Sequence, residues 1–290
     1  MTKYFAVVEG GGTKFNCAIV DSHQKIYVEE RIATTTPKET LGGVVAFFNQ
    51  QKNNGYNFKK LGLGCFGPLD LNKHSANYGS ITSTPKPHWS NTRVAPILAE
   101  SLDCQVEIDT DVNAAALAEH LWGASKDAQV NIYVTVGTGL GVGVVINGQP
   151  LHGLIHPEMG HMLVSGLDEI KGICPFHGQC FEGMASGKAM SMIWQQAAET
   201  LPDEHQAWDI QAKVLGQLCH NLMLAFSPQS LVLGGGVMAK PGLVEKTIYY
   251  ADQSLNQYIV YPENYSLERI ISKPGLGERS GLYGALALVL

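Results

Sequence analysis

The chain has 290 residues, of which 45% are hydrophobic and 16% charged, and its net charge at neutral pH is −6. This composition excludes a disordered or fibrous protein and is sufficient for two domains of ordinary size. Basic residues are scattered rather than gathered in a stripe, so we expect no nucleic-acid partner. No apolar run is typical of a signal peptide or a transmembrane helix, so we expect no membrane partner. Together with six cysteines, this indicates a reducing, cytoplasmic location.

In chain order, the first half predicts short strands followed by alternating helices and strands. The expected strands cover 3–11, 14–21, 25–34, 61–67 and 104–111. The expected helices cover about 39–51, about 94–102, and an Ala-rich stretch that begins at Val112. A glycine turn separates the first two strands.

The pattern then starts again in the second half of the chain. Its expected strands cover 131–139, 140–148, 230–236 and 269–275, and its expected helices cover 186–200, 207–226, about 240–258, and a terminal stretch from Arg279. Two successive halves of this kind indicate an internal repeat at the level of the fold. Alternating strands and helices predict mostly parallel sheets covered on both faces, with a ligand cleft between two such domains.

Three glycine-rich segments end strands at the same edge of the predicted sheets. They read EGGGTK from Glu9, GTGLG from Gly137 and LGGGV from Leu233. Without Cβ atoms, such turns let a phosphate reach backbone N–H groups. The first two lack the spacing of a P-loop, and a strand follows each of them, unlike a dinucleotide-binding turn. A hairpin alone explains one such turn, but three at one edge favour a nucleotide site.

A compact group of metal-ligating side chains occupies GICPFHGQCFEG, residues 172–183. Cys174, His177 and Cys180 lie within seven residues, and Glu182 follows. Zinc prefers four sulfur and nitrogen ligands in a tetrahedron, so the segment supplies three of them. The alternatives are two buried free thiols beside a surface histidine, or a disulfide between Cys174 and Cys180, which a reducing compartment disfavours.

Taken in order, the segments EGGGTK, DTDVN, GTGLGVG, HPEMGH, CPFHGQCFEG and LGGGV resemble the ROK family of sugar kinases and related repressors. That family belongs to the actin/hexokinase-like ATPase superfamily. The resemblance covers essentially the whole chain and implies an α/β fold of two ribonuclease-H-like domains with a central cleft and a zinc-binding loop. The domains are expected at 1–113 and 114–290, with the final helix, about 279–290, packing back on the first.

The resemblance also implies a role for each residue that matches a family motif. The zinc ligands would be Cys174, His177, Cys180 and His161, with His156 as a rival for the fourth place, and a closed site of this kind is structural. The sugar-binding residues would be Gly67, Pro68, Thr110, Asp111, Glu158, His161 and Glu182. The ATP-binding residues would be Gly11, Gly12, Thr13, Lys14, Gly137, Thr138, Gly139, Gly234, Gly235 and Gly236, with Mg²⁺ on the ATP phosphates.

Asp111 matches the catalytic aspartate of the family. A carboxylate at a strand end can accept the proton of a sugar hydroxyl as that hydroxyl attacks the γ-phosphate. A second interpretation makes Asp111 the N-cap of the helix from Val112, and Asp109 ranks well below it as a base. Two positions depart from the family pattern: Thr110 replaces a common asparagine, and Glu9 replaces a common aspartate.

The implied activity is that of an ATP-dependent hexose kinase. The CPFHGQC form of the zinc loop and the stretch GSITSTPKPHW, residues 79–89, are similar to the fructokinase branch, with fructose 6-phosphate as product. The alternatives are a glucose, mannose or N-acetylhexosamine kinase, because hexose hydroxyls differ only in placement. A sugar-responsive repressor is disfavoured because the chain starts directly at the first strand, without a helix-turn-helix. The family also implies a homodimer.

Overall fold

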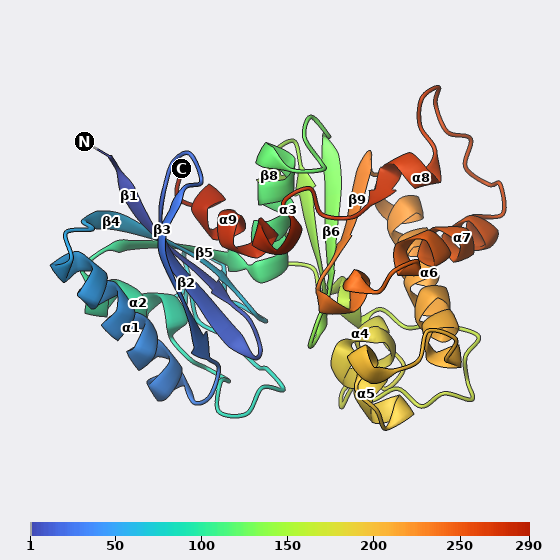
Figure 1. The fold of residues 1–290 in the computed structure, drawn as a ribbon, viewed down its shortest axis with the longest axis horizontal. Helices are drawn as coiled ribbons and strands as arrows, with labels where there is room; N and C mark the ends of the chain where they lie inside the picture. Colours follow the sequence, from blue (N-terminus) through green and yellow to red (C-terminus); the bar gives the residue numbers. More distant parts are fainter. Residues whose placement is uncertain (1) are drawn as a thin grey trace.

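The computed structural model describes residues 2–290, which form two five-stranded sheets that lie side by side (Figure 1). The first sheet has the order β3-β2-β1-β4-β5, and its strands are β1 (Tyr4–Gly10), β2 (Lys14–Asp21), β3 (Ile26–Ala33), β4 (Phe58–Cys65) and β5 (Gln105–Thr110). The strands β1 to β3 pair antiparallel, whereas β4 and β5 continue the sheet in parallel.

The second sheet has the same arrangement, which confirms the predicted internal repeat. Read from its antiparallel edge, its order is β8-β7-β6-β9-β10. The strands are β6 (Val130–Val136), β7 (Leu140–Ile146), β8 (Gln149–Pro150), β9 (Ser230–Gly234) and β10 (Ile271–Ser272). Again three antiparallel strands come first and two parallel strands extend the sheet.

Strand β1 is apolar on both faces because helices cover both. Ala6 and Val8 belong to the core under α1 (Pro37–Asn53) and α2 (Val94–Leu102), whereas Phe5 and Val7 face α9 (Ser280–Ala287). Helix α1 begins at a capping box in which Thr36 and Glu39 satisfy each other's backbone N–H groups. The continuous hydrophobic run of β1 is thus typical of a strand that is buried between two layers of helices.

Helices α3 (Asp111–Trp122) and α9 pack together between the two sheets (Figure 1). Their close approach depends on a glycine, because a Cβ on Gly284 of α9 would lie 2.3 Å from the Ala114 backbone. Helix α3 also packs closely on β7, where a Cβ on Gly143 would lie 2.2 Å from the Val112 carbonyl. Helix α9 also packs on β1 and β4 of the first sheet.

The buried carboxylate of Glu119 joins these two helices. It accepts hydrogen bonds from the backbone N–H groups of Ala124, Gly275 and Leu276 and from the Ser280 hydroxyl. These bonds satisfy the charge inside the protein and hold the start of α9 against the end of α3.

The remaining helices lie on the side of the second sheet away from α3 and α9, at the right of Figure 1, with α4 and α5 below the others. They are α4 (Phe181–Ala185), α5 (Gly187–Trp194), α6 (Gln206–Phe226), α7 (Leu243–Leu255) and α8 (Leu267–Ile270). The helix predicted over 186–200 is wrong in length, because Gln195 is left-handed, with a φ of 54°, and ends α5. The strand predicted over 269–275 is reduced to β10, because α8 precedes it and Pro274 has no N–H for the ladder.

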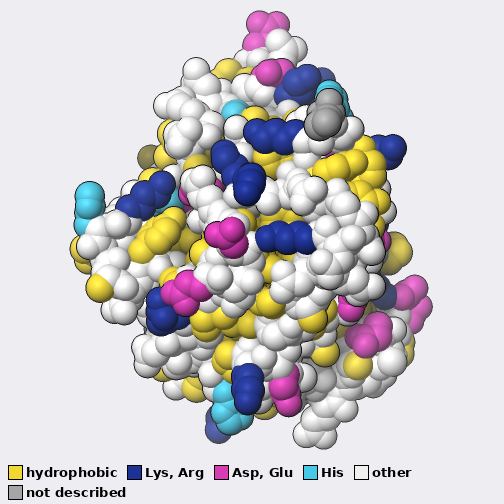
Figure 2. All heavy atoms as spheres, turned by 90° about the vertical axis from the view of Figure 1, so that its left-hand side faces the viewer, with side chains coloured by type: hydrophobic (Ala, Val, Ile, Leu, Met, Phe, Trp, Pro, Cys, Tyr) yellow, Lys and Arg dark blue, Asp and Glu magenta, His cyan; other side chains and the backbone are white. Residues whose placement is uncertain are grey.

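On the face formed by the first half of the chain, basic side chains lie among acidic and apolar ones (Figure 2). Within residues 2–290, none of the helices combines the length and the apolar character needed to cross a bilayer.

Candidate active site

A cleft of about 1480 Å³ lies between the two halves of the molecule. Pockets for drug-sized ligands measure roughly 300–1,000 Å³, so this cleft has room for two small substrates at once. Most of the residues that the sequence assigned to ATP and sugar line it. They are Gly11, Gly12, Thr13, Lys14, Gly67, Pro68, Thr110, Asp111, Gly137, Thr138, Gly139, Glu158, His161, Glu182, Gly235 and Gly236. Glu9, which was not assigned to either ligand, lines the cleft as well.

The first two glycine turns form opposite parts of the cleft wall. Thr34 anchors the β1–β2 turn, because its hydroxyl donates to the Gly11 carbonyl at 2.8 Å. The β6–β7 turn is anchored by the N–H of Gly187, which donates to the Gly137 carbonyl at 2.7 Å. Cβ atoms on Gly12 and Gly137 would meet nothing within 4 Å, so both positions open toward the cleft. Both turns are held in place while their backbone remains accessible, as phosphate binding requires.

The third glycine run divides into residues with different roles. A Cβ on Gly234 would lie 2.2 Å from the Tyr133 hydroxyl, so packing alone requires glycine there, and this residue lies outside the cleft lining. Gly235 has a φ of 92°, and a Cβ there would lie 2.5 Å from the Val136 carbonyl. Gly235 and Gly236 line the cleft, beside the second glycine turn.

Asp111 lies at the first turn of α3 and faces the cleft. The expectation that it caps this helix is wrong: the N-cap is Thr110, whose hydroxyl accepts the Asn113 N–H at 3.1 Å. Burial raises the pKa of Asp111 to about 6, and the neighbouring carboxylates of Glu9 and Glu182 add to this rise. A carboxylate with this pKa is ionised at neutral pH and remains a better proton acceptor than an ordinary aspartate.

Asp109, the lower-ranked candidate, already has partners for its carboxylate. One oxygen accepts from the Asn113 side chain at 2.8 Å, and the other lies 2.9 Å from Nε2 of His152. Its side chain is 4% exposed and is absent from the cleft lining. Asp109 is therefore a structural residue that supports the end of β5.

Glu9 extends from the end of β1 into the cleft. Burial raises its pKa, although the side chain of Asn16 donates to it at 2.7 Å and opposes that rise. A Cβ on Gly281 would lie 2.1 Å from the Glu9 carboxylate, so the longer side chain fits only because α9 presents a glycine there. Glu9 and Asp111 together provide two carboxylates, which fits a site for Mg²⁺ bound to substrate phosphates.

Cys174, His177, Cys180 and His161 form a compact group whose ligand atoms all lie within 4.8 Å of one another. Nδ1 of His161 lies 3.5 Å from Sγ of Cys180 and 3.8 Å from Sγ of Cys174, and Nδ1 of His177 lies 3.6 Å from Sγ of Cys174. In a tetrahedral zinc site, the usual bond lengths place sulfur and nitrogen ligands about 3.6 Å apart. The donor set and its spacing therefore fit zinc.

The rival ligand, His156, is not part of this group. Its Nε2 accepts the backbone N–H of Leu69 at 2.9 Å, and the ring is 3% exposed. Burial lowers the pKa of His156, which keeps the ring neutral and able to accept.

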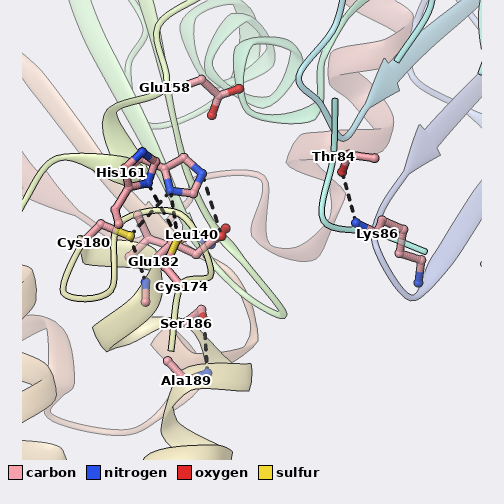
Figure 3. A network of polar contacts seen from close by, with 12 residues as sticks. Thr84, Lys86, Leu140, Glu158, His161, Cys174, Cys180, Glu182, Ser186 and Ala189 are labelled. Atoms are coloured by element: carbon pink, nitrogen blue, oxygen red, sulfur yellow. Dashed lines mark hydrogen bonds and ion pairs between the residues drawn. The ribbon is translucent and has the colours of Figure 1, made fainter. Parts of the chain in front are cut away.

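Glu158, His161 and Glu182 lie on one wall of the cleft (Figure 3). Burial raises the pKa of Glu158 to about 7, and the carboxylates of Glu182 and Asp111 add to the effect. One oxygen of Glu182 accepts the Leu140 N–H at 3.1 Å, and the other lies 3.9 Å from Nε2 of His161. Glu182 thus connects the second glycine turn with the metal-ligand group.

The opposite wall holds residues to which the sequence reasoning assigned no role. Lys86 donates from Nζ to the Gly12 carbonyl in the first glycine turn, and Thr84 lies beside it (Figure 3). Both come from the stretch GSITSTPKPHW, where a lysine between two prolines was the available signal. Trp89 fixes this stretch, because its buried ring stacks on Phe15 and its N–H donates to the Thr35 carbonyl at 2.8 Å.

The sequence profile of the ROK family matches residues 5–290. The chain belongs to the ROK family. A fructokinase from Zymomonas mobilis is 45% identical over 99% of this chain and 97% of its own length. A fructokinase from Lactococcus lactis is 38% identical over 96% of this chain and 93% of its own length.

Among solved structures, the ROK hexokinase from Thermus thermophilus superimposes with a TM-score of 0.76, at 25% identity over 99% of this chain and 97% of that one. The fold predicted from the resemblance, two α/β units of the actin/hexokinase type around a cleft, is confirmed.

Proposed function

We propose that this member of the ROK family is an ATP-dependent fructokinase that converts fructose to fructose 6-phosphate. The observation that carries the proposal is the position of Asp111, a half-buried carboxylate that faces a cleft lined by two open glycine turns. Relatives named fructokinase that match nearly the full chain support the choice of sugar.

In the proposed reaction, Asp111 accepts the proton of the fructose 6-hydroxyl while the oxygen of that hydroxyl attacks the γ-phosphorus of ATP. The bond from that phosphorus to the bridging oxygen breaks, and ADP leaves. The turns at Gly11–Thr13 and Gly137–Gly139 hold the phosphates through their backbone N–H groups, and Gly235 and Gly236 lie close to the nucleoside. Glu9 and Asp111 are the carboxylates that would lie beside a phosphate-bound Mg²⁺, which would supply charge neutralisation on the phosphates.

The zinc site is proposed to be structural, with His161, Cys174, His177 and Cys180 as its ligands. Nδ1 of His161 faces the thiols, which leaves Nε2 free to face Glu182 and the sugar. The metal would then fix the loop that carries the sugar-binding Glu158 and Glu182.

We further propose that residues 1–113 and 114–290 act as two domains that close on the substrates and exclude water. The thiolates of the zinc site require a reducing compartment, so a cytoplasmic location is part of the proposal. A homodimer is proposed on the family resemblance alone.

The first prediction concerns substrate choice: kcat/KM for fructose should exceed kcat/KM for glucose, mannose and N-acetylhexosamines. Glu158, His161 and Glu182 present acceptors and a donor at fixed positions, and each buried polar group left unpaired costs about 1–3 kcal/mol. Two unpaired groups give a discrimination on the order of a hundredfold. Initial rates with each hexose at saturating ATP test this, and mannose should be the best of the poor substrates. A glucose rate equal to that of fructose would contradict the sugar assignment while leaving the kinase assignment intact.

The second prediction concerns pH. The raised pKa of Asp111 means that the base is ionised above about pH 6 and protonated below it. We therefore expect kcat/KM for fructose to fall about tenfold per pH unit below this value. Glu9→Gln removes a charge that raises the pKa of Asp111. The acidic limb of the plot of kcat/KM against pH should therefore move to lower pH in this variant, whatever happens to the maximal rate. Glu100→Gln, on the surface of α2, is the control and should leave the limb unmoved. An acid limb that stays in place in Glu9→Gln would argue against Asp111 as the titrating group.

A further inference from the structure

The loop between β8 and the zinc-ligand group contacts the first half of the molecule at two points. His152 lies 2.9 Å from the Asp109 carboxylate at the end of β5, and His156 accepts the Leu69 N–H at 2.9 Å. Leu69 directly follows Gly67 and Pro68, which line the cleft from the first half. The loop therefore connects the two walls of the proposed sugar site.

His156 has a contact on each side of its ring. With Nε2 accepting from Leu69, the proton of the neutral ring is on Nδ1, and this nitrogen lies 3.5 Å from Oε1 of Glu158. A Cβ on Gly67 would lie 3.5 Å from the imidazole, so the ring also packs against the turn before Pro68. The ring is 3% exposed, which leaves it little freedom to turn.

We infer that His156 is a positioning residue for sugar binding, which aims the carboxylate of Glu158 and holds the turn at Gly67–Leu69 at a fixed distance from it. A buried histidine with one nitrogen on each wall sets the width of the site. Because the two walls are already joined, binding of the sugar does not have to order them first. This lowers the entropic cost of binding and so favours affinity. This inference rests on the proposed kinase function and adds to it how the sugar end of the cleft is assembled before ATP binds.

The test compares His156→Leu, which removes both contacts, with His156→Gln and His156→Asn. Glutamine places its amide near Nε2, and asparagine places its amide near Nδ1. For His156→Leu we expect the fructose KM to rise on the order of tenfold to a hundredfold, with the ATP KM and kcat at saturating fructose within about twofold of wild type. Each polar variant should recover part of the lost fructose affinity, so that its fructose KM lies between those of His156→Leu and wild type. Calorimetry with fructose alone should show the same loss of binding without ATP.

A double-mutant cycle with Glu158→Gln separates positioning from general loosening of the loop. If His156 acts through Glu158, then His156→Leu should raise the fructose KM less in the Glu158→Gln background than in wild type. Three results would overturn the inference. The effects of the two substitutions on the fructose KM could be additive, the ATP KM could rise as much as the fructose KM in His156→Leu, or the kinetics of His156→Leu could be unchanged. If His156→Leu does not fold, as judged by its melting transition, the asparagine and glutamine variants carry the cycle. A wild-type protein that phosphorylates no hexose refutes the proposed function instead, so the two failures are distinct.

Discussion

Replacing Asp111 with asparagine should lower kcat by about two to four orders of magnitude, the usual effect of removing a positioned general base. Asparagine has the same shape and retains an oxygen that can accept the Val112 N–H, which Asp111 accepts at 3.0 Å. The KM for ATP should change little, because the glycine turns that hold the phosphates remain in place. Steady-state rates from ADP release, measured over a range of fructose and ATP concentrations, provide the values.

Stability measurements distinguish this loss from unfolding. Burial raises the pKa of Asp111 from an ordinary 3.8 to about 6, so the ionised carboxylate destabilises the folded state above that pH. The uncharged asparagine should therefore be at least as stable as wild type at pH 8. Asp109→Asn is the matched control, because Asp109 lies only two residues before Asp111, at the end of β5, and outside the cleft lining. Near-normal turnover in Asp111→Asn, or an equal loss in Asp109→Asn, would refute the assignment of the base.

The second large effect concerns the metal. Purified protein should contain about one zinc per chain, and Cys174→Ser or Cys180→Ser should lose most of it, since each removes one of four ligands. The melting temperature should fall as well, because structural zinc binding contributes directly to folding. The fructose KM should rise more than the ATP KM, because the loop that the metal fixes carries Glu158 and Glu182. Metal analysis and thermal melts of the same preparations test these expectations together.

Cys104→Ser is the control for this experiment. Cys104 is a half-buried free thiol outside the cluster, so the variant should keep its zinc and its affinity for fructose. Wild-type protein that contains no zinc after purification without chelators would disprove the site. Serine variants that retain both zinc and stability would show that other residues bind the metal.

Local features of the sequence were sufficient to predict much of the fold. The alternation of buried strands and helices, and its repetition in the second half, predicted two similar sheets before any contact was known, because hydrophobic periodicity follows from which face is buried. The errors lie where a single residue decides the backbone. Gln195 adopts a left-handed conformation and ends α5, and nothing in the hydrophobic pattern around it marks that end.

Single motifs identified the residue types at the site but not all of their partners. Cys174, His177 and Cys180 lie within seven residues, so one loop brings them together, and their spacing alone indicated a metal. The N-cap prediction missed by one residue: the sequence reasoning gave the role to Asp111, and the backbone at the end of β5 assigns it to Thr110. That choice leaves the Asp111 carboxylate free to face the cleft.

By itself, the sequence determined the chemistry that the chain can perform: each glycine turn, each carboxylate at a strand end and three of the four proposed metal ligands stand in a short local motif. Only the tertiary structure decided which of two histidines joins the metal-ligand group and which binds elsewhere. His156 lies five residues before His161, yet its hydrogen-bond partner is the backbone of Leu69, 87 positions away. Contacts across such distances depend on how α3 and α9 place the two sheets, and they leave no periodic signal in the sequence.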